Sequence, residues 1–337
     1  MTLKSVFVPQ LNQSIKFARK RPVPGGYCLK LHNYLRASLP TPPTSVDYTG
    51  KAVSVLANIY DNDTLGDCVI AGGYHVVGVE TGNAGKVFTA TNSQIIADYS
   101  AIGGYVPGNS NTDQGCDEKT ALGYWTSHGF ANGTKLLGWL AVDPTNKTEL
   151  MQALYLFENL YFGIELPDAW ITPFPSASGF TWGVAGQADP ENGHCIMGAG
   201  YNSNGVTIDT WGMLGTLTWA AIAKYCIATE GGEIYVMLTP DQLAKGQTTA
   251  PNGVAWTDLI SDFDSLGGSV PVPTPPTPTP PTPTPPAPTP PSTTVTLAQA
   301  QAWAISGLQQ TRWSVVSRTQ AEVLVRNSLA SHWPTGK

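Results

Sequence analysis

Several features that often reveal a protein's class or location are scarce in this 337-residue chain. Only 12% of its residues are charged, and five are cysteines. No apolar run approaches the ~20 residues of a membrane-spanning helix. Before its first basic stretch the N-terminus offers only Val6-Phe7-Val8, which is too short for the apolar core of a secretory signal peptide. The sequence therefore predicts neither a signal peptide nor a transmembrane segment.

The cysteines show no disulfide framework, which favours a reducing or neutral compartment. The location stays unknown: a cytoplasmic or virion-associated protein is favoured, and export by another route is left open. His32, His128 and His332 have no cysteine or acid at metal-ligand spacing. Phosphate-binding loops and nucleic-acid-binding signatures are also missing. We therefore expect no cofactor, no metal and no nucleic-acid partner.

Acidic residues are absent from residues 1–40, which contain seven Lys or Arg. Residues 41–294 contain 23 acidic and seven basic residues, and residues 295–337 contain four basic residues and Glu322. One interpretation is a basic arm that lies on an acidic domain, where attraction is strongest at low ionic strength. The other is a disordered leader beside a domain whose charge keeps it soluble.

Three residues far apart in the sequence form a pattern that carries chemistry. Cys68 begins a helical pattern at 68–80, His194 lies in a strand-like run at 193–201, and Asp209 lies in the next strand-like run. A helix N-terminus lowers the pKa of a thiol, because its partial positive charge stabilises the thiolate. A nearby His can act as base and acid, and a third group can orient its ring. This order of residues is typical of a thiol hydrolase.

The motifs around these residues resemble those of the papain family of cysteine peptidases. The matching segments are Pro42 to Tyr48, Ser93 to Tyr99, Gly115-Cys116, Ala121 to Trp125, Gly193-His194 and Asp209-Thr210-Trp211-Gly212. They are collinear over roughly residues 41–240. The chain looks like a divergent bacterial or phage member of the family.

The resemblance implies an α+β fold of two lobes, the papain-like cysteine proteinase fold, with a substrate cleft between them. It implies that Cys68 attacks a peptide carbonyl, that His194 is base and then acid, and that Asp209 orients His194. Asn62 and the Cys68 backbone N–H would hold the oxyanion. Asn62 stands where the family has Gln, and Asp209 stands where the family has Asn. Leu65 stands where the family has a cysteine that forms a disulfide bond with the Cys116 region.

The pattern of composition predicts five segments. They are a basic arm at 1–40, interpreted as a short propeptide, a peptidase domain at 41–245, a connecting segment at 246–269, a Pro/Thr-rich linker at 270–294 and a two-helix module at 295–337. The linker favours polyproline II. Thr296 with Gln299 and Ser317 with Gln320 resemble helix-capping boxes in the last segment. About 43 residues bury little surface, so docking of this module on an unknown partner is left open.

Within the central domain, helices are expected at 91–101, 117–129 and 147–159 besides 68–80, and strands at 160–166, 193–201, 206–208 and 234–238. Gly72-Gly73 inside the first helix predicts close packing against another backbone. His75 is two turns from Cys68, about 10 Å along the helix. It is interpreted as a packed helical histidine.

Three functions fit these residues. The first is a cysteine peptidase acting on a peptide or protein substrate. The second is a cysteine amidase acting on cell-wall peptides or another amide, because the same Cys-His pair serves both reactions. The third is a catalytically inactive papain-fold module with a structural or adhesion role, on a surface or a virion.

Overall fold

A computed structural model describes residues 3–22, 28–36, 41–243 and 254–265. These residues fall within one compact unit, Met1–Pro273. The whole predicted linker and the whole C-terminal module lie outside the described residues, so the five-segment division stays a prediction. Within the described ranges no helix combines the length and apolar character needed to cross a membrane.

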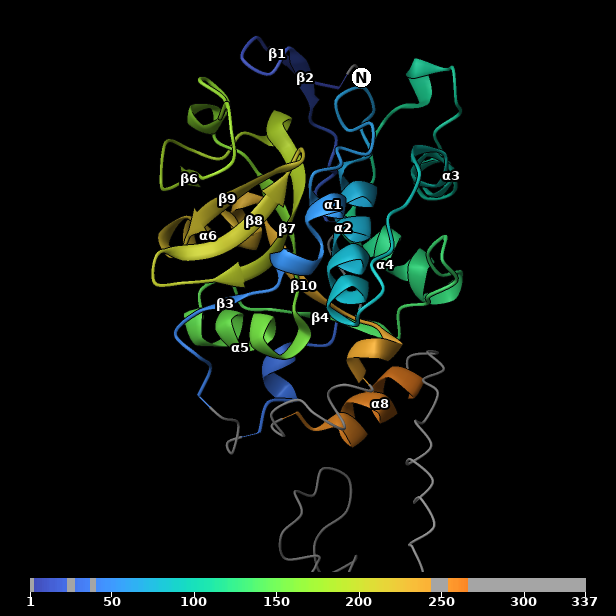
Figure 1. Ribbon diagram of the computed structural model, residues 1–337, viewed down its shortest axis with the longest axis vertical. Coiled ribbons are helices and arrows are strands. Elements are labelled where there is room, and N and C mark those ends of the chain that lie inside the picture. Colours follow the sequence, from blue (N-terminus) through green and yellow to red (C-terminus); the bar gives the residue numbers. More distant parts are fainter. Residues whose placement is uncertain (1–2, 23–27, 37–40, 244–253, 266–337) are drawn as a thin grey trace, which may run out of the picture. The chain divides into compact units, whose positions relative to one another are not determined.

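The helices expected in the first half of the domain form close to their predicted positions (Figure 1). The helices of the described chain are α1 (Val53–Leu56), α2 (Cys68–Asn83), α3 (Asn92–Gly103), α4 (Glu118–Ser127), α5 (Lys147–Phe157), α6 (Trp219–Tyr225) and α8 (Trp256–Ser265). Local sequence sets several starts. Thr91 and Gln94 form a reciprocal capping box at α3, and the Asp117 side chain accepts from the backbone N–H of Thr120 at α4.

The strands form a mixed sheet and a separate N-terminal hairpin. They are β1 (Ser5–Val8), β2 (Gln13–Lys16), β3 (Val46–Asp47), β4 (Gly138–Ala141), β5 (Leu160–Glu165), β6 (Phe180–Trp182), β7 (Gly193–Tyr201), β8 (Gly205–Thr210), β9 (Met213–Thr218) and β10 (Glu233–Leu238). The sheet order is β4-β10-β5-β7-β8-β9-β6, with β3 beside β7. All neighbours are antiparallel except β6 and β9.

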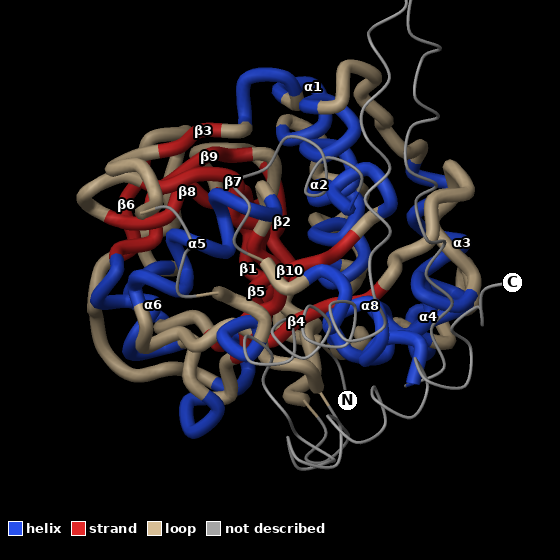
Figure 2. Tube along the Cα trace, turned by 90° about the horizontal axis from the view of Figure 1, so that it is seen from below, coloured by secondary structure: helices blue, strands red, loops and turns tan. Residues whose placement is uncertain are grey.

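Strand alternation explains why the domain has two hydrophobic cores. On β7, Ile196 belongs to the core that contains α5 and α6, whereas Cys195 and Met197 belong to the core that contains α2, α3 and α4. Successive side chains of a strand point to opposite faces, so β7 is buried from both sides. Figure 2 shows the strands between α2 on one side and α5 and α6 on the other. This arrangement is the expected two-lobed α+β fold.

The glycine pair in α2 permits very close helix packing. A Cβ atom on Gly73 would lie 2.2 Å from the Trp125 ring, and one on Gly72 would lie 3.0 Å from Cys195 Sγ. The predicted close approach is therefore present, but the partners are side chains. The expected backbone partner was wrong.

The basic arm contacts the acidic domain along its length. Ion pairs join Lys4 to Asp168 and Asp189, Lys16 to Asp113, Arg19 to Glu118 and Glu233, and Arg21 to Glu165. Each pair matches a base of the arm with an acid of the domain, as the charge segregation predicts. In Figure 1 the β1–β2 hairpin of the arm lies at the top of the molecule, beside the junction of helices and sheet.

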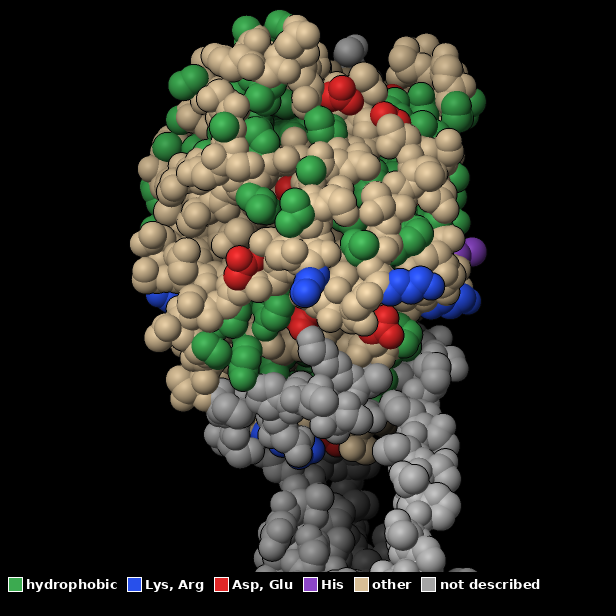
Figure 3. All heavy atoms as spheres, in the orientation of Figure 1, with side chains coloured by type: hydrophobic (Ala, Val, Ile, Leu, Met, Phe, Trp, Pro, Cys, Tyr) green, Lys and Arg blue, Asp and Glu red, His purple; other side chains and the backbone are tan. Residues whose placement is uncertain are grey.

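Charged side chains are sparse on one face of the described residues. On the face drawn in Figure 3, most exposed atoms belong to uncharged residues, with isolated acidic and basic side chains between them. This agrees with the low charged fraction of the sequence. Every Lys or Arg ion pair found among the described residues involves a base of the arm.

Candidate active site

Cys68 and His194 meet at the junction of the two lobes. Cys68 is the first residue of α2, and His194 is the second residue of β7. Both line one cavity of about 10 Å³, room for about one water molecule. The cavity is lined by Ile59, Asn62, Cys68, Ala71, Gly72, His75, His194, Cys195, Asp209, Thr210 and Trp211. The fold thus brings all four predicted site residues to one place.

The ring of His194 is held by Thr210 and Trp211. Its Nε2 atom lies 2.8 Å from Thr210 Oγ1, and its ring stacks on Trp211 with centroids 3.7 Å apart and planes within 4°. Its Nδ1 atom is buried without a hydrogen-bond partner. An Nε2–H that donates to Thr210 would leave the Nδ1 lone pair free to take a proton.

Asp209 does not make the contact expected of it. Its Oδ2 atom lies 3.0 Å from Nδ1 of His75, and Nε2 of His75 lies 2.9 Å from the Asn58 carbonyl oxygen. Burial raises the pKa of Asp209, and the attraction of His75 opposes that rise. The ring of His194 is therefore oriented by Thr210, which the sequence analysis missed, and Asp209 is paired with a second histidine.

Strand register explains this correction. Asp209 and Thr210 are consecutive on β8, so their side chains point to opposite faces. Asp209 pairs with Met197, which belongs to the core that contains α2. Thr210 therefore lies on the other face of the sheet, the face of Ile196 and His194. The only sequence signal for Thr210 was its place next to Asp209.

Asn62 is buried but its amide is already used. Its Nδ2 atom donates to the Leu65 carbonyl at 3.1 Å and to Asp67 Oδ1 at 3.2 Å. Both hydrogens of the amide therefore serve the loop before α2, and the expected oxyanion role is not formed. The backbone N–H of Cys68 remains suited to that role, because the first N–H groups of a helix have no intrahelical acceptor.

The ionisation expected for Cys68 is also corrected. Burial raises the pKa of the Cys68 thiol to about 12 and lowers the pKa of His194 to about 3. Within the described residues no hydrogen bond joins the two side chains. Both shifts favour the neutral thiol and the neutral imidazole, whereas a low thiol pKa was predicted from the helix start.

The arm runs across the two lobes beside this pair of residues. The backbone N–H groups of Ala18 and Arg19 both donate to the Gly193 carbonyl at 3.0 Å, and Lys20 N–H donates to the Cys116 carbonyl at 3.0 Å. A Cβ atom on Gly115 would lie 1.7 Å from Ala18 O, so only glycine fits beneath the arm. The segment is hydrogen-bonded to both lobes.

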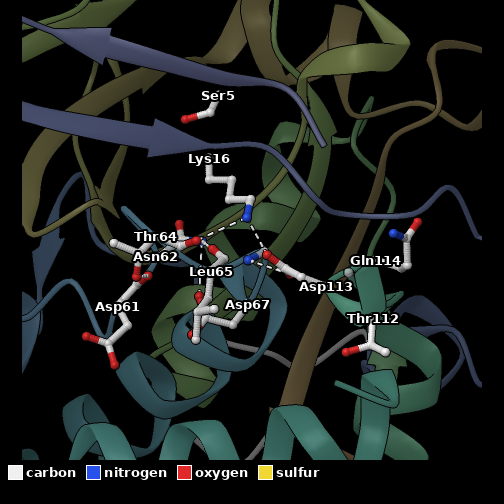
Figure 4. Close-up of polar contacts among 12 residues, drawn as sticks. Ser5, Lys16, Asp61, Asn62, Thr64, Leu65, Asp67, Thr112, Asp113 and Gln114 are labelled. Atoms are coloured by element: carbon white, nitrogen blue, oxygen red, sulfur yellow. Dashed lines mark hydrogen bonds and ion pairs between the residues drawn. The ribbon is translucent and has the colours of Figure 1, made fainter. Parts of the chain in front are cut away.

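Lys16 ties the arm to the loop that precedes the nucleophile, as Figure 4 shows. Its ammonium group donates to the Thr64 carbonyl at 3.0 Å and to the Asp113 carboxylate. The same carboxylate accepts the Gly66 N–H at 3.0 Å and the Tyr99 hydroxyl at 2.6 Å. Asp113 therefore links the arm, the nucleophile loop and α3.

Two further features frame the site. All five cysteines are free, and no group of His, Cys, Asp or Glu among the described residues could hold a metal ion.

Trp170 and Trp182 stack in parallel at 4.9 Å and line a separate hollow of about 400 Å³ that Gln10 of the arm also borders. Both tryptophan side chains are buried.

Comparisons with known proteins give the fold a precedent. No family model and no curated protein sequence matches the chain. Xylellain, a cysteine protease from Xylella fastidiosa, superposes with a TM-score of 0.53 at 14% identity, over 66% of this chain and 96% of that one. Procathepsin L 3 from the Tenebrio molitor midgut matches with a TM-score of 0.45 at 16% identity, over 66% and 75%. The chain has the fold of the papain-like cysteine proteases.

Proposed function

We propose that this protein is a cysteine peptidase in which Cys68 is the nucleophile and His194 the general base. One observation carries the proposal: an extended peptide, the arm itself, lies across Cys68 and is hydrogen-bonded to the strand that carries His194. A substrate would use the same acceptors, the carbonyls of Gly193 and Cys116. The papain-like fold supports this assignment.

The reaction follows from the positions of a few atoms. The Cys68 thiol gives its proton to Nδ1 of His194, and the thiolate attacks the peptide carbonyl. The Cys68 backbone N–H donates to the oxyanion at the helix N-terminus. The imidazolium then protonates the leaving amine, and water hydrolyses the thioester with His194 again as base.

Thr210 and Asp209 support this reaction in different ways. Thr210 accepts from Nε2 of His194, so it fixes the tautomer and the ring plane. Asp209 is a positioning residue in this proposal, because it acts through His75 and the adjacent β8 backbone. Asn62 supports the loop that presents Cys68.

We further propose that residues 1–40 act as a short propeptide that keeps the enzyme inactive. Cys68 and His194 are both buried, and Phe17 of the arm packs edge-on against the His194 ring, which supports this role. Displacing the arm would hydrate both groups and permit the thiolate–imidazolium pair, since burial disfavours charge on each.

Hydrolysis of a peptide library tests the function. The full chain is compared with Arg19→Ala, in which a main anchor of the arm is lost. Cys68→Ala and His194→Ala in that background should abolish cleavage, whereas Cys226→Ser, a buried cysteine of the other core, should retain it. Cleavage that survives Cys68→Ala would refute the proposal.

An inactive module is the second candidate, because the Asn62 amide is engaged and Cys68 is neutral. It predicts no cleavage in any variant and no covalent labelling by a peptide electrophile when Arg19 is removed. The amidase would be favoured if the electrophile labels the protein and a cell-wall peptide is cleaved while the library peptides are not.

A further inference from the structure

The side chain of Arg19 occupies a closed acidic pocket next to the nucleophile. Its Nε atom lies 2.9 and 3.0 Å from the two carboxylate oxygens of Glu118, and its Nη2 lies 2.7 Å from Glu233 Oε1. Its Nη1 donates to the Gly231 carbonyl. The side chains of Arg19 and Glu118 are fully buried, and that of Glu233 is 9% exposed. Every side of the guanidinium has an acceptor.

The peptidase domain alone builds this pocket. Glu118 starts α4, Glu233 starts β10, and the Tyr235 hydroxyl donates to the second oxygen of Glu233. Gly163 on β5 leaves the space for the guanidinium, because a Cβ atom there would lie 2.4 Å from two of its nitrogens. The site is therefore shaped from three separate segments of the domain.

Two buried carboxylates side by side require a cation. Burial raises the pKa of Glu118 well above its usual range, and Glu233 adds to that rise. Burial alone would lower the pKa of Arg19, but the attraction of Glu118 and Glu233 outweighs it and raises that pKa. A buried charge without its partner is costly. When the arm leaves, the pocket must therefore take up another cation or protons.

The pocket lies one residue along the arm from the nucleophile. Ala18 lies beside Gly66, two residues before Cys68: a Cβ atom on Gly66 would lie 2.5 Å from Ala18 Cβ. Arg19, the next residue, donates its backbone N–H to the carbonyl that precedes His194. A peptide bound in the same path would place one side chain in this pocket.

We propose that Glu118, Glu233 and the Gly231 carbonyl form a substrate subsite for an arginine side chain, which Arg19 fills while the arm is docked. The inference rests on the proposed function and names its substrate class, peptides with a basic residue beside the scissile bond. Arginine fits better than lysine, because three nitrogens of its planar guanidinium each meet an acceptor. A single ammonium group cannot reach all of these acceptors at once.

The first test measures binding without catalysis. Full-length Arg19→Ala is titrated with n-propylguanidinium or with its neutral isostere n-propylurea, and the melting temperature is recorded. We expect a saturable rise with the guanidinium only. The rise should be absent in wild type, whose pocket is full, and in the Arg19→Ala, Glu233→Gln double variant. Equal effects of both compounds on Arg19→Ala would overturn the subsite.

The second test measures selectivity. Peptides that differ only by arginine or citrulline at the tested position are offered to Arg19→Ala, and kcat/KM should favour arginine at least ~100-fold, because a site built for hydrogen bonds rejects analogues that leave them unmade. Cleavage of both peptides at equal rates would overturn the subsite and leave the peptidase function standing. Guanidinium binding with no cleavage of any peptide would keep the subsite and reject the peptidase function.

Discussion

Thr210 shows how one hydroxyl decides the geometry of the candidate site. It is the only hydrogen-bond partner of the His194 ring among the described residues, and the Trp211 ring covers the same imidazole from one face. The neighbouring Asp209 has the charge but not the contact. A polar atom at the correct face of β8 therefore matters more here than a carboxylate.

Replacing Thr210 tests this role. Thr210→Val keeps the shape and removes the acceptor, so kcat/KM in the Arg19→Ala background should fall by about 10²-fold, the lower end of general acid–base contributions. Thr210→Ser should restore most of the activity. Thr207→Val, on the same strand and outside the cavity, is the matched control. Equal loss in the Thr207 and Thr210 variants would assign the effect to strand packing.

Ionisation of Cys68 gives a second prediction at this scale. With the arm docked, the pKa of Cys68 is about 12. The difference in thiolate absorbance between wild type and Cys68→Ser should therefore be zero below about pH 10. His194, whose pKa is about 3, binds a proton more readily unfolded than folded. It therefore lowers folding stability as pH falls from 6.5 towards 3. A thiolate signal at pH 7 would contradict the neutral pair.

At the scale of elements, α2 owes its position to its two adjacent glycines. Gly73 lies so close to the Trp125 ring that a side chain at this position would clash with it. Helical glycines normally cost stability, by about 1 kcal/mol relative to alanine. In α2 that cost is offset by the close packing that puts Cys68 at the lobe junction.

Two alanine substitutions separate these effects. Gly73→Ala forces a methyl group into Trp125 and should lower the free energy of unfolding by about 1–3 kcal/mol, the usual cost of overpacking. Gly123→Ala in α4, where a Cβ meets nothing within 4 Å, should raise it by up to about 1 kcal/mol. Urea unfolding measures both. A stabilised Gly73→Ala would show that α2 can shift away from α4.

Long helices and buried strands were predictable, and short or tertiary-dependent elements were not. α2 to α5 and β5, β7 and β10 have strong local patterns. By contrast, β6 and the β1–β2 hairpin have three or four residues per strand, too few for periodicity to show. The Cys68–His194 junction followed from the family motifs. The partners of Asp209 and Asn62 depended on register and loop geometry, which no sequence spacing reveals.

At the scale of the whole molecule, the arm and domain are joined by ion pairs of unequal burial. Arg19 is fully enclosed, whereas the Arg21 side chain is 56% exposed beside Glu165. Solvent screens an exposed pair, which is worth about 0–1 kcal/mol. Breaking a buried pair costs about 3–5 kcal/mol. The two arginines of the same arm should therefore hold it very unequally.

Alkylation of Cys68 measures this difference. Because the thiol is buried, iodoacetamide reaches it only after the arm moves. Arg19→Ala should label at least ~100-fold faster than wild type, and Arg21→Ala no more than a few-fold faster. Added salt should accelerate wild type modestly. The Cys68 peptide is followed by mass spectrometry, since half-buried Cys28 also reacts. Identical rates in all variants would show that the arm does not guard Cys68.

The hydrogen bonds from Ala18 and Arg19 to Gly193 make the arm a ligand tethered to its own receptor. Short tethers give effective concentrations in the millimolar range, so a free peptide of equal affinity at micromolar concentration could not displace the arm. Opening is then an event within one chain. The lag before activity should follow first-order kinetics and stay the same when the protein is diluted tenfold.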